Sequence, residues 1–353
     1  MKSQQLILSR DIRKELEGFL RQCDYDKLFV LVDENTHNLS LPVLENIFSD
    51  FQAIHISIPA NDSSKNLDSL AAVWTALSRK GATRHSLLIN LGGGMVTDLG
   101  GFAASTFKRG IPYINIPTTL LSMVDAAVGG KTGINFNGLK NEIGVFCPAI
   151  AVFIDTEFLR TLDQPNLFSG YAEMIKHGLI STEQHWRELL TFDLEEVDYP
   201  ALRELVGHSV RIKEAVVEKD PYEKGIRKAL NLGHTVGHAF ESLALSEGRP
   251  VLHGYAVAWG LVCELYLSQV VTGFPNEEMK RAILFIKKIY GSFYFDCKVY
   301  DQLYELMKHD KKNQSDTINF TLLAGLGDIC IDQTASKELI FEMFDFYREC
   351  MGI

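Results

Sequence analysis

Ser86-Leu-Leu-Ile-Asn-Leu-Gly-Gly-Gly94 is the stretch that indicates the fold of this 353-residue chain. A short apolar run ends in three glycines, and a helical pattern follows from about Thr97-Asp98. An apolar run without alternation is typical of a strand buried on both faces of a parallel sheet. The glycines let the backbone approach a ligand closely, and the helix start offers N–H groups to an anion. Because the spacing departs from GxGxxG, both a tight turn and a phosphate cradle remain open.

Similar apolar runs recur through the first half of the chain, with helical patterns between them. They cover residues 27–33, 53–58, 113–116 and 151–155. Beyond about residue 160 the period is 3.6, at 171–180, 201–218, 234–245, 254–271, 278–290 and 336–351, with one strand-like piece at 317–323. We therefore predict a Rossmann-like α/β nucleotide-binding domain with a parallel sheet over residues 1–160, and a mainly α-helical domain over residues 161–353.

The composition of the chain restricts the binding partners and the cellular compartment that we expect for the protein. A net charge of −10 argues against nucleic acid or an anionic membrane, although a small anionic substrate can still bind where basic groups converge. The six cysteines form no CxxC motif, which argues against a zinc ribbon or a disulfide scaffold. The first apolar run is too short for a signal peptide, and no stretch of about 18 apolar residues occurs. We expect a cytoplasmic protein.

Three histidines indicate a possible metal site. His234 and His238 are four residues apart in the run Asn231-Leu-Gly-His-Thr-Val-Gly-His, and His253 follows fifteen residues later. Positions i and i+4 share one face of a helix, and the spacing favours this pair as joint ligands of a divalent metal. A packed, hydrogen-bonded histidine pair is the alternative. Glu173 lies on another predicted helix, with Lys176 and His177 on the same face. Its carboxylate is either a third ligand or one half of a surface salt bridge.

A polar, glycine-rich stretch follows the predicted strand at 113–116. Asp125 and Lys131 lie in it, and Lys140-Asn141 follows. The glycines make room and the lysines can meet an anion, unless the stretch is a solvated loop. Asp33 ends an earlier strand, where it either accepts a bond from a ribose hydroxyl or forms a turn.

Taken together and in order, these segments resemble the 3-dehydroquinate synthases, over roughly residues 29 to 325. The matching motifs are Gly92-Gly-Gly with Asp98, Gly101-Phe102, Arg109-Gly110-Ile111, Pro117-Thr-Thr, Asp125, Gly129-Gly-Lys-Thr-Gly-Ile-Asn135, Lys140-Asn141, Ala172-Glu173 with Lys176, Lys213, Asn231-Leu-Gly-His-Thr-Val-Gly-His238 and His253-Gly254. The resemblance implies a dehydroquinate synthase-like fold and a homodimer. It also implies NAD and a zinc or cobalt ion in a cleft between the two domains.

The resemblance also implies the reaction and its phosphorylated sugar-acid substrate, 3-deoxy-D-arabino-heptulosonate 7-phosphate. NAD oxidises the C5 alcohol, which acidifies the C6 proton, and phosphate is eliminated. The ketone is then reduced back, the ring opens, and an intramolecular aldol reaction closes the carbocycle of 3-dehydroquinate. The cofactor returns unchanged. Such an enzyme is a phosphate lyase of the shikimate pathway for aromatic amino acids.

The resemblance assigns roles by position. Glu173, His234 and His253 match the metal ligands, so His238 moves from the metal to the phosphate. The phosphate set is Lys131, Asn141, Arg227, His238 and Lys311 or Lys312, with Arg109 reaching in from the partner subunit. Asp125, Lys176, Lys213 and Asn231 match residues that bind the substrate's hydroxyls and carboxylate. For NAD the matches are Asp33, Asn35, Asp62, Lys65, Gly93, Gly94, Met95, Asp98, Thr118, Thr119, Asp125, Lys131, Lys140, Asn141, Phe158 and Thr161.

Several positions depart from the family pattern. Asp62 replaces a glutamate, Pro165-Asn166 an Arg-Glu pair, Ala126-Ala127 a serine pair and Tyr255 a glutamate. None removes a catalytic position. The alternatives are another sugar-phosphate cyclase, a metal-dependent polyol dehydrogenase on the same fold, and a non-catalytic binding protein. The intact run from Gly129 to Asn135 argues against another cyclase. The phosphate-binding set argues against a dehydrogenase, and the complete metal set argues against a non-catalytic binding protein.

Overall fold

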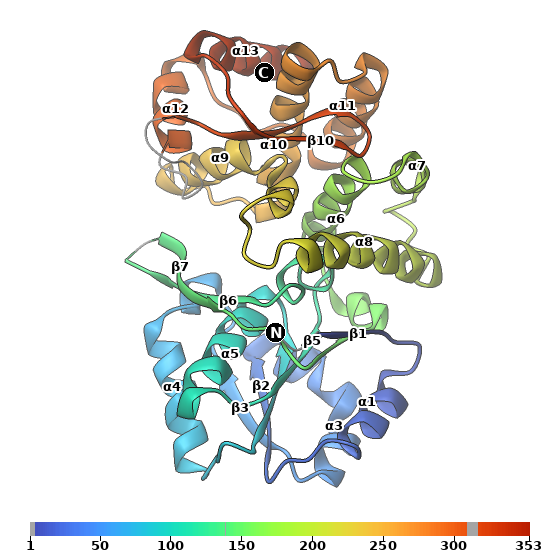
Figure 1. The fold of residues 1–353 in the computed structure, drawn as a ribbon, viewed down its shortest axis with the longest axis vertical. Coiled ribbons are helices and arrows are strands. Elements are labelled where there is room, and N and C mark those ends of the chain that lie inside the picture. The colour runs from blue at the N-terminus through green and yellow to red at the C-terminus, as the bar shows by residue number, and fades with distance from the viewer. Residues whose placement is uncertain (1–3, 138, 309–316) are drawn as a thin grey trace. The chain divides into compact units, whose positions relative to one another are not determined.

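The structure, a computed structural model, describes residues 4–137, 139–308 and 317–353. They form two compact units (Figure 1). The first comprises Met1–Asp163 with Asp198–Val210, and the second comprises Gln164–Val197 with Arg211–Ile353. The return of residues 198–210 to the first unit was not predicted from the sequence.

A six-stranded sheet organises the first unit. Its order is β1-β8-β5-β4-β2-β3, and every neighbouring pair is parallel. The strands are β1 (Gln5–Leu8), β2 (Leu28–Asp33), β3 (Ile54–Ile58), β4 (Leu87–Gly92), β5 (Tyr113–Pro117) and β8 (Ala151–Ile154). All residues of β2, β4, β5 and β8 are buried, so their continuous apolar runs are explained by helices on both faces. The predicted parallel α/β fold is confirmed.

The helices of the first unit cover the sheet from both sides. Figure 1 shows α4 and α5 against one face and α1 and α3 against the other. The helices are α1 (Ile12–Leu20), α2 (Glu34–Leu39), α3 (Leu41–Asp50), α4 (Leu67–Arg79) and α5 (Gly94–Thr106), with short turns η1 (Asp62–Ser64), η2 (Phe107–Arg109), η3 (Ser122–Ala126) and η4 (Thr156–Thr161). The helix α5 begins at Gly94, three residues before the predicted start, and Gly93 is its extended cap residue.

The strand order reverses between β2 and β4. After β2 the chain adds β3 on one side and then returns to place β4, β5 and β8 on the other. In open α/β sheets, ligands bind beyond the carboxyl ends of the strands at such a switch point. Asp33 ends β2 and Gly92 ends β4, so both residues lie at this edge.

An antiparallel hairpin of β6 (Lys131–Phe136) and β7 (Leu139–Phe146) lies against α5. The hairpin was not predicted, since its glycines and polar residues are typical of a loop. Cβ atoms would not fit at two of these glycines: at Gly133 a Cβ would lie 2.6 Å from the Ile143 carbonyl oxygen, and at Gly144 it would lie 2.1 Å from that of Thr132. The glycines therefore permit the close pairing of the two strands.

The second unit is mainly helical, as predicted. Its helices are α6 (Gln164–Leu179), α7 (Glu183–Thr191), α9 (His234–Ser246), α10 (His253–Leu267), α11 (Asn276–Tyr290), α12 (Tyr300–Lys308) and α13 (Lys337–Met351), with η5 (Ile226–Asn231), η6 (Ser268–Thr272) and η7 (Cys297–Val299). The helix α8 (Tyr199–Lys219) begins in the first unit and ends in the second. A hairpin of β9 (Phe320–Gly325) and β10 (Asp328–Gln333) replaces the single strand that was predicted.

The helix α10 forms the centre of the second unit. It packs against α6, α9, α11 and α13 and is buried over most of its length. The segment His253–Thr272 has the length and mean hydropathy (1.2) of a membrane span, but 72% of the apolar window is buried inside the protein. A helix that is apolar on all sides is expected at the centre of a helical core.

Candidate metal centre and nucleotide-binding edge

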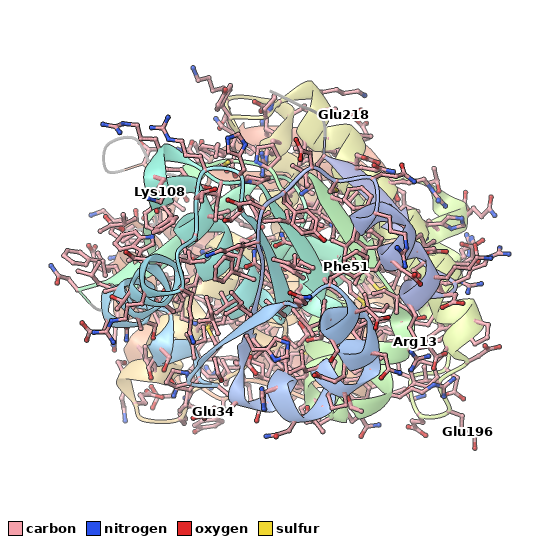
Figure 2. The ribbon with its side chains drawn as sticks, turned by 90° about the horizontal axis from the view of Figure 1, so that it is seen from below. Arg13, Glu34, Phe51, Lys108, Glu196 and Glu218 are labelled. Carbon is pink, nitrogen blue, oxygen red and sulfur yellow. The ribbon has the colours of Figure 1, made fainter. Side chains whose placement is uncertain are left out.

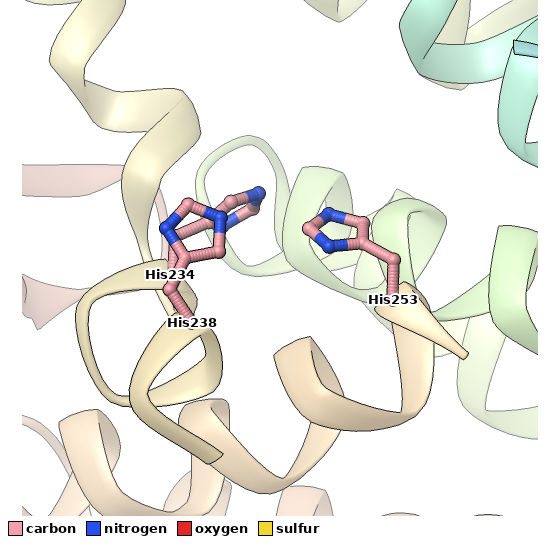
Figure 3. A group of neighbouring side chains, drawn as sticks. All are labelled: His234, His238 and His253. Atoms are coloured by element: carbon pink, nitrogen blue, oxygen red, sulfur yellow. The ribbon is translucent and has the colours of Figure 1, made fainter. Parts of the chain in front are cut away.

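Three imidazoles converge in the second unit. His234 and His238 extend from α9, and His253 extends from the first turn of α10 toward them (Figure 3). The ring centroids of His234 and His238 are 5.4 Å apart, and those of His234 and His253 are also 5.4 Å apart. One nitrogen atom from each ring lies within 4.8 Å of the other two, which is close enough for the three to share a metal ion.

The carboxylate of Glu173 on α6 faces two of these rings. Its Oε1 lies 3.4 Å from His234 Nε2 and 3.5 Å from His253 Nε2. Both of its oxygens are fully buried without a hydrogen-bond partner of good geometry. Two ligand atoms of one tetrahedral zinc ion are about 3.3–3.5 Å apart, so these separations fit a shared metal. The residues therefore fit a divalent ion that is coordinated by one carboxylate and two imidazoles.

The other ring nitrogens of these two histidines have partners of their own. His234 Nδ1 lies 3.1 Å from the Leu232 carbonyl oxygen, so it carries the proton of a neutral ring. His253 Nδ1 lies 3.3 Å from Glu241 Oε2. Contacts of this kind fix the orientation of a metal-bound imidazole and leave Nε2 for the ion. Glu241 was not predicted, although it follows His234 by seven residues, two helical turns away on the same face of α9.

The charges at the centre explain its pKa shifts. Burial alone would raise the pKa of Glu173, but the Lys176 ammonium and the His234 imidazole lower it well below its usual range. Burial opposes protonation of His253, yet Glu173 and Glu241 together raise its pKa to about 10. The carboxylates thus hold a positive charge at this point, which a divalent cation can supply in place of the proton.

Two donor sets share His234 and His253. The third donor is either His238, as the i, i+4 spacing favours, or Glu173, as the family resemblance implies. Glu173 Oε1 is within 3.5 Å of both shared imidazoles. Its carboxylate is also fully buried, and a negative charge there attracts a divalent cation more strongly than a neutral imidazole does. Geometry and electrostatics therefore favour Glu173 and leave His238 one helical turn further along α9.

Three predicted cations of the second unit are buried, although such residues are rarely buried unless paired. Lys176 and Glu173 form an ion pair inside the protein. Lys213 is 5% exposed and Arg227 is 2% exposed. Arg227 Nη1 donates to the Pro221 carbonyl oxygen at 2.6 Å. These three cations therefore lie in the interior, where they can interact strongly with an anion.

The loop between α8 and η5 contacts two predicted substrate-binding residues of η5, Arg227 and Asn231. Asp220 accepts hydrogen bonds from the backbone N–H groups of Lys224, Gly225 and Arg227, at 2.9, 2.6 and 3.2 Å. Asn231 Nδ2 donates to Glu223 Oε1 at 2.9 Å. Asp220 and Glu223 were not identified from the sequence, because the hydrogen bonds by which they hold this segment depend on the conformation of the loop.

In the first unit, the glycines after β4 form the start of α5. No side chain caps this helix start, so its first N–H groups are available to an anion. A Cβ on Gly93 would lie 3.1 Å from Thr119 Cγ2, and one on Gly94 would lie 3.2 Å from Ala126 Cβ. Thr118 N donates to the Gly92 carbonyl oxygen and joins the ends of β5 and β4. The structure therefore brings these predicted residues together at the switch point.

A second group of predicted residues surrounds Lys65. Its buried ammonium lies 2.5 Å from Asp98 Oδ2 and also contacts Asn141 Oδ1. Asn141 has a left-handed backbone (φ 52°), and its N–H donates to Asn135 Oδ1 at 3.0 Å. The structure thus brings together Lys65, Asp98 and Asn141, which come from three separate segments.

Asp33 is a capping residue of α2. Its Oδ1 accepts from Thr36 N at 2.8 Å, and Thr36 Oγ1 accepts from Asp33 N at 2.9 Å. This capping box is sufficient to explain why an aspartate ends β2, and the explanation requires no bound ligand. A ribose contact by Asp33 therefore stays a prediction.

The remaining predicted residues differ in exposure. Phe158 is buried, Asp125 is half-buried in the π-helical turn η3, and Met95 is half-buried in the first turn of α5. The exposed ones are Asn35, Arg109, Lys131, Lys140 and Thr161. Lys311 and Lys312 lie outside the described residues, as does the side chain of Asp62.

Solved structures with this fold are sugar-phosphate cyclases and their structural relatives. The 2-epi-5-epi-valiolone synthase of Streptomyces hygroscopicus, solved with NAD+ and Zn2+, superposes with a TM-score of 0.88 at 24% identity, over 98% of this chain and 97% of that one. A 2-deoxy-scyllo-inosose synthase, solved with carbaglucose-6-phosphate, NAD+ and Co2+, gives 0.86 at 22% identity, over 98% and 96%. These likenesses show the fold.

Sequence comparison shows the family. Residues 55–169 match the 3-dehydroquinate synthase N-terminal profile, and residues 170–313 match the 3-dehydroquinate synthase C-terminal profile. A 3-dehydroquinate synthase of Parabacteroides distasonis is 56% identical over 353 residues, which is all of both chains. The chain belongs to the 3-dehydroquinate synthase family.

Proposed function

We propose that the protein is a 3-dehydroquinate synthase of the shikimate pathway, a phosphate lyase that converts 3-deoxy-D-arabino-heptulosonate 7-phosphate to 3-dehydroquinate and phosphate. The observation that carries this proposal is the full-length 56% identity to a protein of that name. The ligand geometry of Glu173, His234 and His253 supports it independently. The six cysteines, all free, are consistent with work in the reducing cytoplasm.

NAD and a zinc or cobalt ion fit the two predicted sites. When bound, NAD would accept and return a hydride, and the metal would act as a Lewis acid toward the substrate's hydroxyl oxygens. The uncapped start of α5 and the Lys65–Asp98 pair support a nucleotide site in the first unit. The buried carboxylate between two imidazoles supports a metal site in the second.

The second unit supplies the metal ligands and several substrate groups. Lys176, Lys213 and Asn231 bind hydroxyl and carboxylate oxygens of the substrate. Arg227 and His238 bind the phosphate as it leaves, because their donors offset its growing negative charge. The 5.4 Å between the rings of His234 and His238 lets a small substrate reach the metal and the phosphate group together.

The first unit supplies the nucleotide site and further phosphate donors. Gly93, Gly94 and Met95 offer backbone N–H groups to the diphosphate of NAD. Lys131 and Asn141 bind the substrate's phosphate, and Asp125 orients a hydroxyl. The other nucleotide residues keep the roles that the family resemblance implies: Asp33, Asn35, Asp62, Lys65, Asp98, Thr118, Thr119, Lys140, Phe158 and Thr161.

One assay tests the proposed function. The purified protein is incubated with the heptulosonate phosphate, NAD and Zn2+ or Co2+, and inorganic phosphate and dehydroquinate are followed together. We expect equal amounts of both products. Phosphate release from a different sugar phosphate alone would identify another cyclase, and NADH accumulation with a polyol would identify a dehydrogenase. A metal-loaded protein that releases no phosphate contradicts the proposal.

Lys131→Ala is expected to lower kcat about 10²–10³-fold, the usual cost of removing one preorganised donor from a developing negative charge. NAD affinity is expected to change far less, because many other groups hold the nucleotide. Steady-state kinetics and NAD titration measure the two effects. The matched control is Lys27→Ala on the same unit, an exposed lysine that donates to the Lys80 carbonyl oxygen and should leave both unchanged. Equal losses of turnover and NAD affinity would assign Lys131 to the nucleotide instead.

We also propose that the protein is a homodimer in which Arg109 reaches the partner's active site. Lys108 and Arg109 both have positive φ, at 49° and 69°, and Figure 2 labels Lys108 in this loop. Such backbone conformations are costly and are concentrated at functional sites. The hairpin of the same unit exposes large apolar side chains, namely Phe136, Leu139, Ile143, Val145 and Phe146. An exposed apolar patch of this kind is typical of a protein interface.

Mixed dimers test the role of Arg109. Each homodimer, Arg109→Ala or His253→Ala, should be inactive. A heterodimer that carries one change on each chain should regain about half of the wild-type activity, because a two-fold dimer then has one complete site. Differently tagged chains allow its isolation. An inactive heterodimer would show that Arg109 serves its own subunit, and a monomeric wild type in sedimentation experiments would contradict the dimer.

A further inference from the structure

The helix α9 begins in an unusual way. Its cap residue, Gly233, is left-handed (φ 79°), and no side chain of its own segment caps the helix. Glu264 of α10 fulfils this function instead: its two carboxylate oxygens accept from Gly233 N at 2.6 Å and from Val236 N at 3.1 Å. Glu264 is completely buried. A carboxylate is favoured at this position because the helix start carries a partial positive charge.

The two helices are also locked together by glycines. A Cβ at Gly260 would lie 2.1 Å from the Gly233 carbonyl oxygen, and one at Gly237 would lie 2.9 Å from that of Ala256. The backbones of α9 and α10 therefore touch directly, and neither helix can slide without a clash. His234 is the first residue of α9 and His253 is the first residue of α10.

We propose that Glu264 is a positioning residue for the metal centre. By bonding the N–H groups on either side of His234, Glu264 fixes the first turn of α9. It thereby fixes the direction in which His234 Nε2 faces Glu173. The inference rests on the proposed metal site and goes beyond its ligands, because Glu264 contacts the backbone of the helix and not the ion. A preorganised site binds its metal more tightly than one that must be ordered on binding.

Glu264→Ala and Glu264→Gln test the proposal. The affinity for Zn2+ is measured by competition with a chromophoric chelator, and the visible absorption of the Co2+-loaded protein reports the coordination geometry. We expect Glu264→Ala to weaken Zn2+ binding about 10–100-fold, as for other groups that support ligands. Its Co2+ spectrum should also change. The Zn2+ affinity of Glu264→Gln should lie between those of the wild type and Glu264→Ala, because the amide keeps one acceptor oxygen.

The matched control is Ser336→Ala, which removes the side-chain cap of α13 in the same unit. It should lower the stability of the protein without changing Zn2+ affinity or the Co2+ spectrum. Should Glu264→Ala fail to fold, the Glu264→Gln protein decides the question. Variants that lose stability but bind Zn2+ as tightly as the wild type, with an unchanged Co2+ spectrum, would overturn the role of Glu264 alone. A wild-type protein that retains no metal would overturn the proposed centre and this inference with it.

Discussion

His253→Ala is expected to abolish metal retention, whereas His238→Ala is expected to leave the metal bound. The reason is the position of Glu173, whose Oε1 lies 3.5 Å from His253 Nε2 and 3.4 Å from His234 Nε2. Loss of His253 removes one of three protein ligands, and a zinc site needs at least three. His238 is one turn along α9, where its loss should lower turnover and not metal content.

Metal analysis after gel filtration measures this difference directly. Thermal unfolding gives a second measure, because a bound ion stabilises the folded state in proportion to the logarithm of its concentration over Kd. We expect added Zn2+ to raise the Tm of the wild type and of His238→Ala, and not that of His253→Ala. His55→Ala, at an exposed histidine on β3, is the matched control and should behave as the wild type. Loss of metal from His238→Ala with retention in His253→Ala would restore the ligand pair that the i, i+4 spacing favours.

The core of the fold could be predicted because burial leaves a local signature. A strand covered on both faces must be apolar throughout, and β2, β4, β5 and β8 all show it. The strand β1 has four residues and lies in a segment too short to show any period. The strand β7 is exposed along its whole length, so its sequence has no buried face that would reveal it.

The metal site could be predicted only in part, because its geometry depends on contacts between helices. The spacing of His234 and His238 places both on one face of a helix, but cannot tell which ring faces the carboxylate. That is decided by α6, which brings Glu173 beside His234 and His253. Glu264 did leave a signal, since it is the only carboxylate in the otherwise apolar α10. Such a residue must have a buried partner, but the sequence does not say which.

Lys176→Met is expected to destabilise the metal-free protein strongly. Lys176 and Glu173 form an ion pair in which both side chains are almost completely buried, at 1% and 0% exposure. Removing one partner of such a pair leaves a buried charge uncompensated, which costs about 3–5 kcal/mol of unfolding free energy. Urea unfolding of the chelator-treated protein measures this loss. The matched control is Lys337→Met, which breaks the exposed pair with Asp301 and should cost about 1 kcal/mol or less.

Zn2+ should reverse much of this loss, because the ion and the Lys176 ammonium neutralise the same carboxylate. If Lys176→Met lowers the unfolding free energy less in the metal-bound protein than in the metal-free protein, the difference must appear as tighter binding of the metal. We therefore expect the variant to bind Zn2+ more tightly than the wild type, even though it loses turnover with its substrate-binding lysine. Weaker Zn2+ binding by a folded Lys176→Met protein would show that the lysine orders Glu173 for the ion and does not compete with it. The buried pair would then be part of the metal site's architecture, and its charge would matter less than the direction in which it holds Oε1.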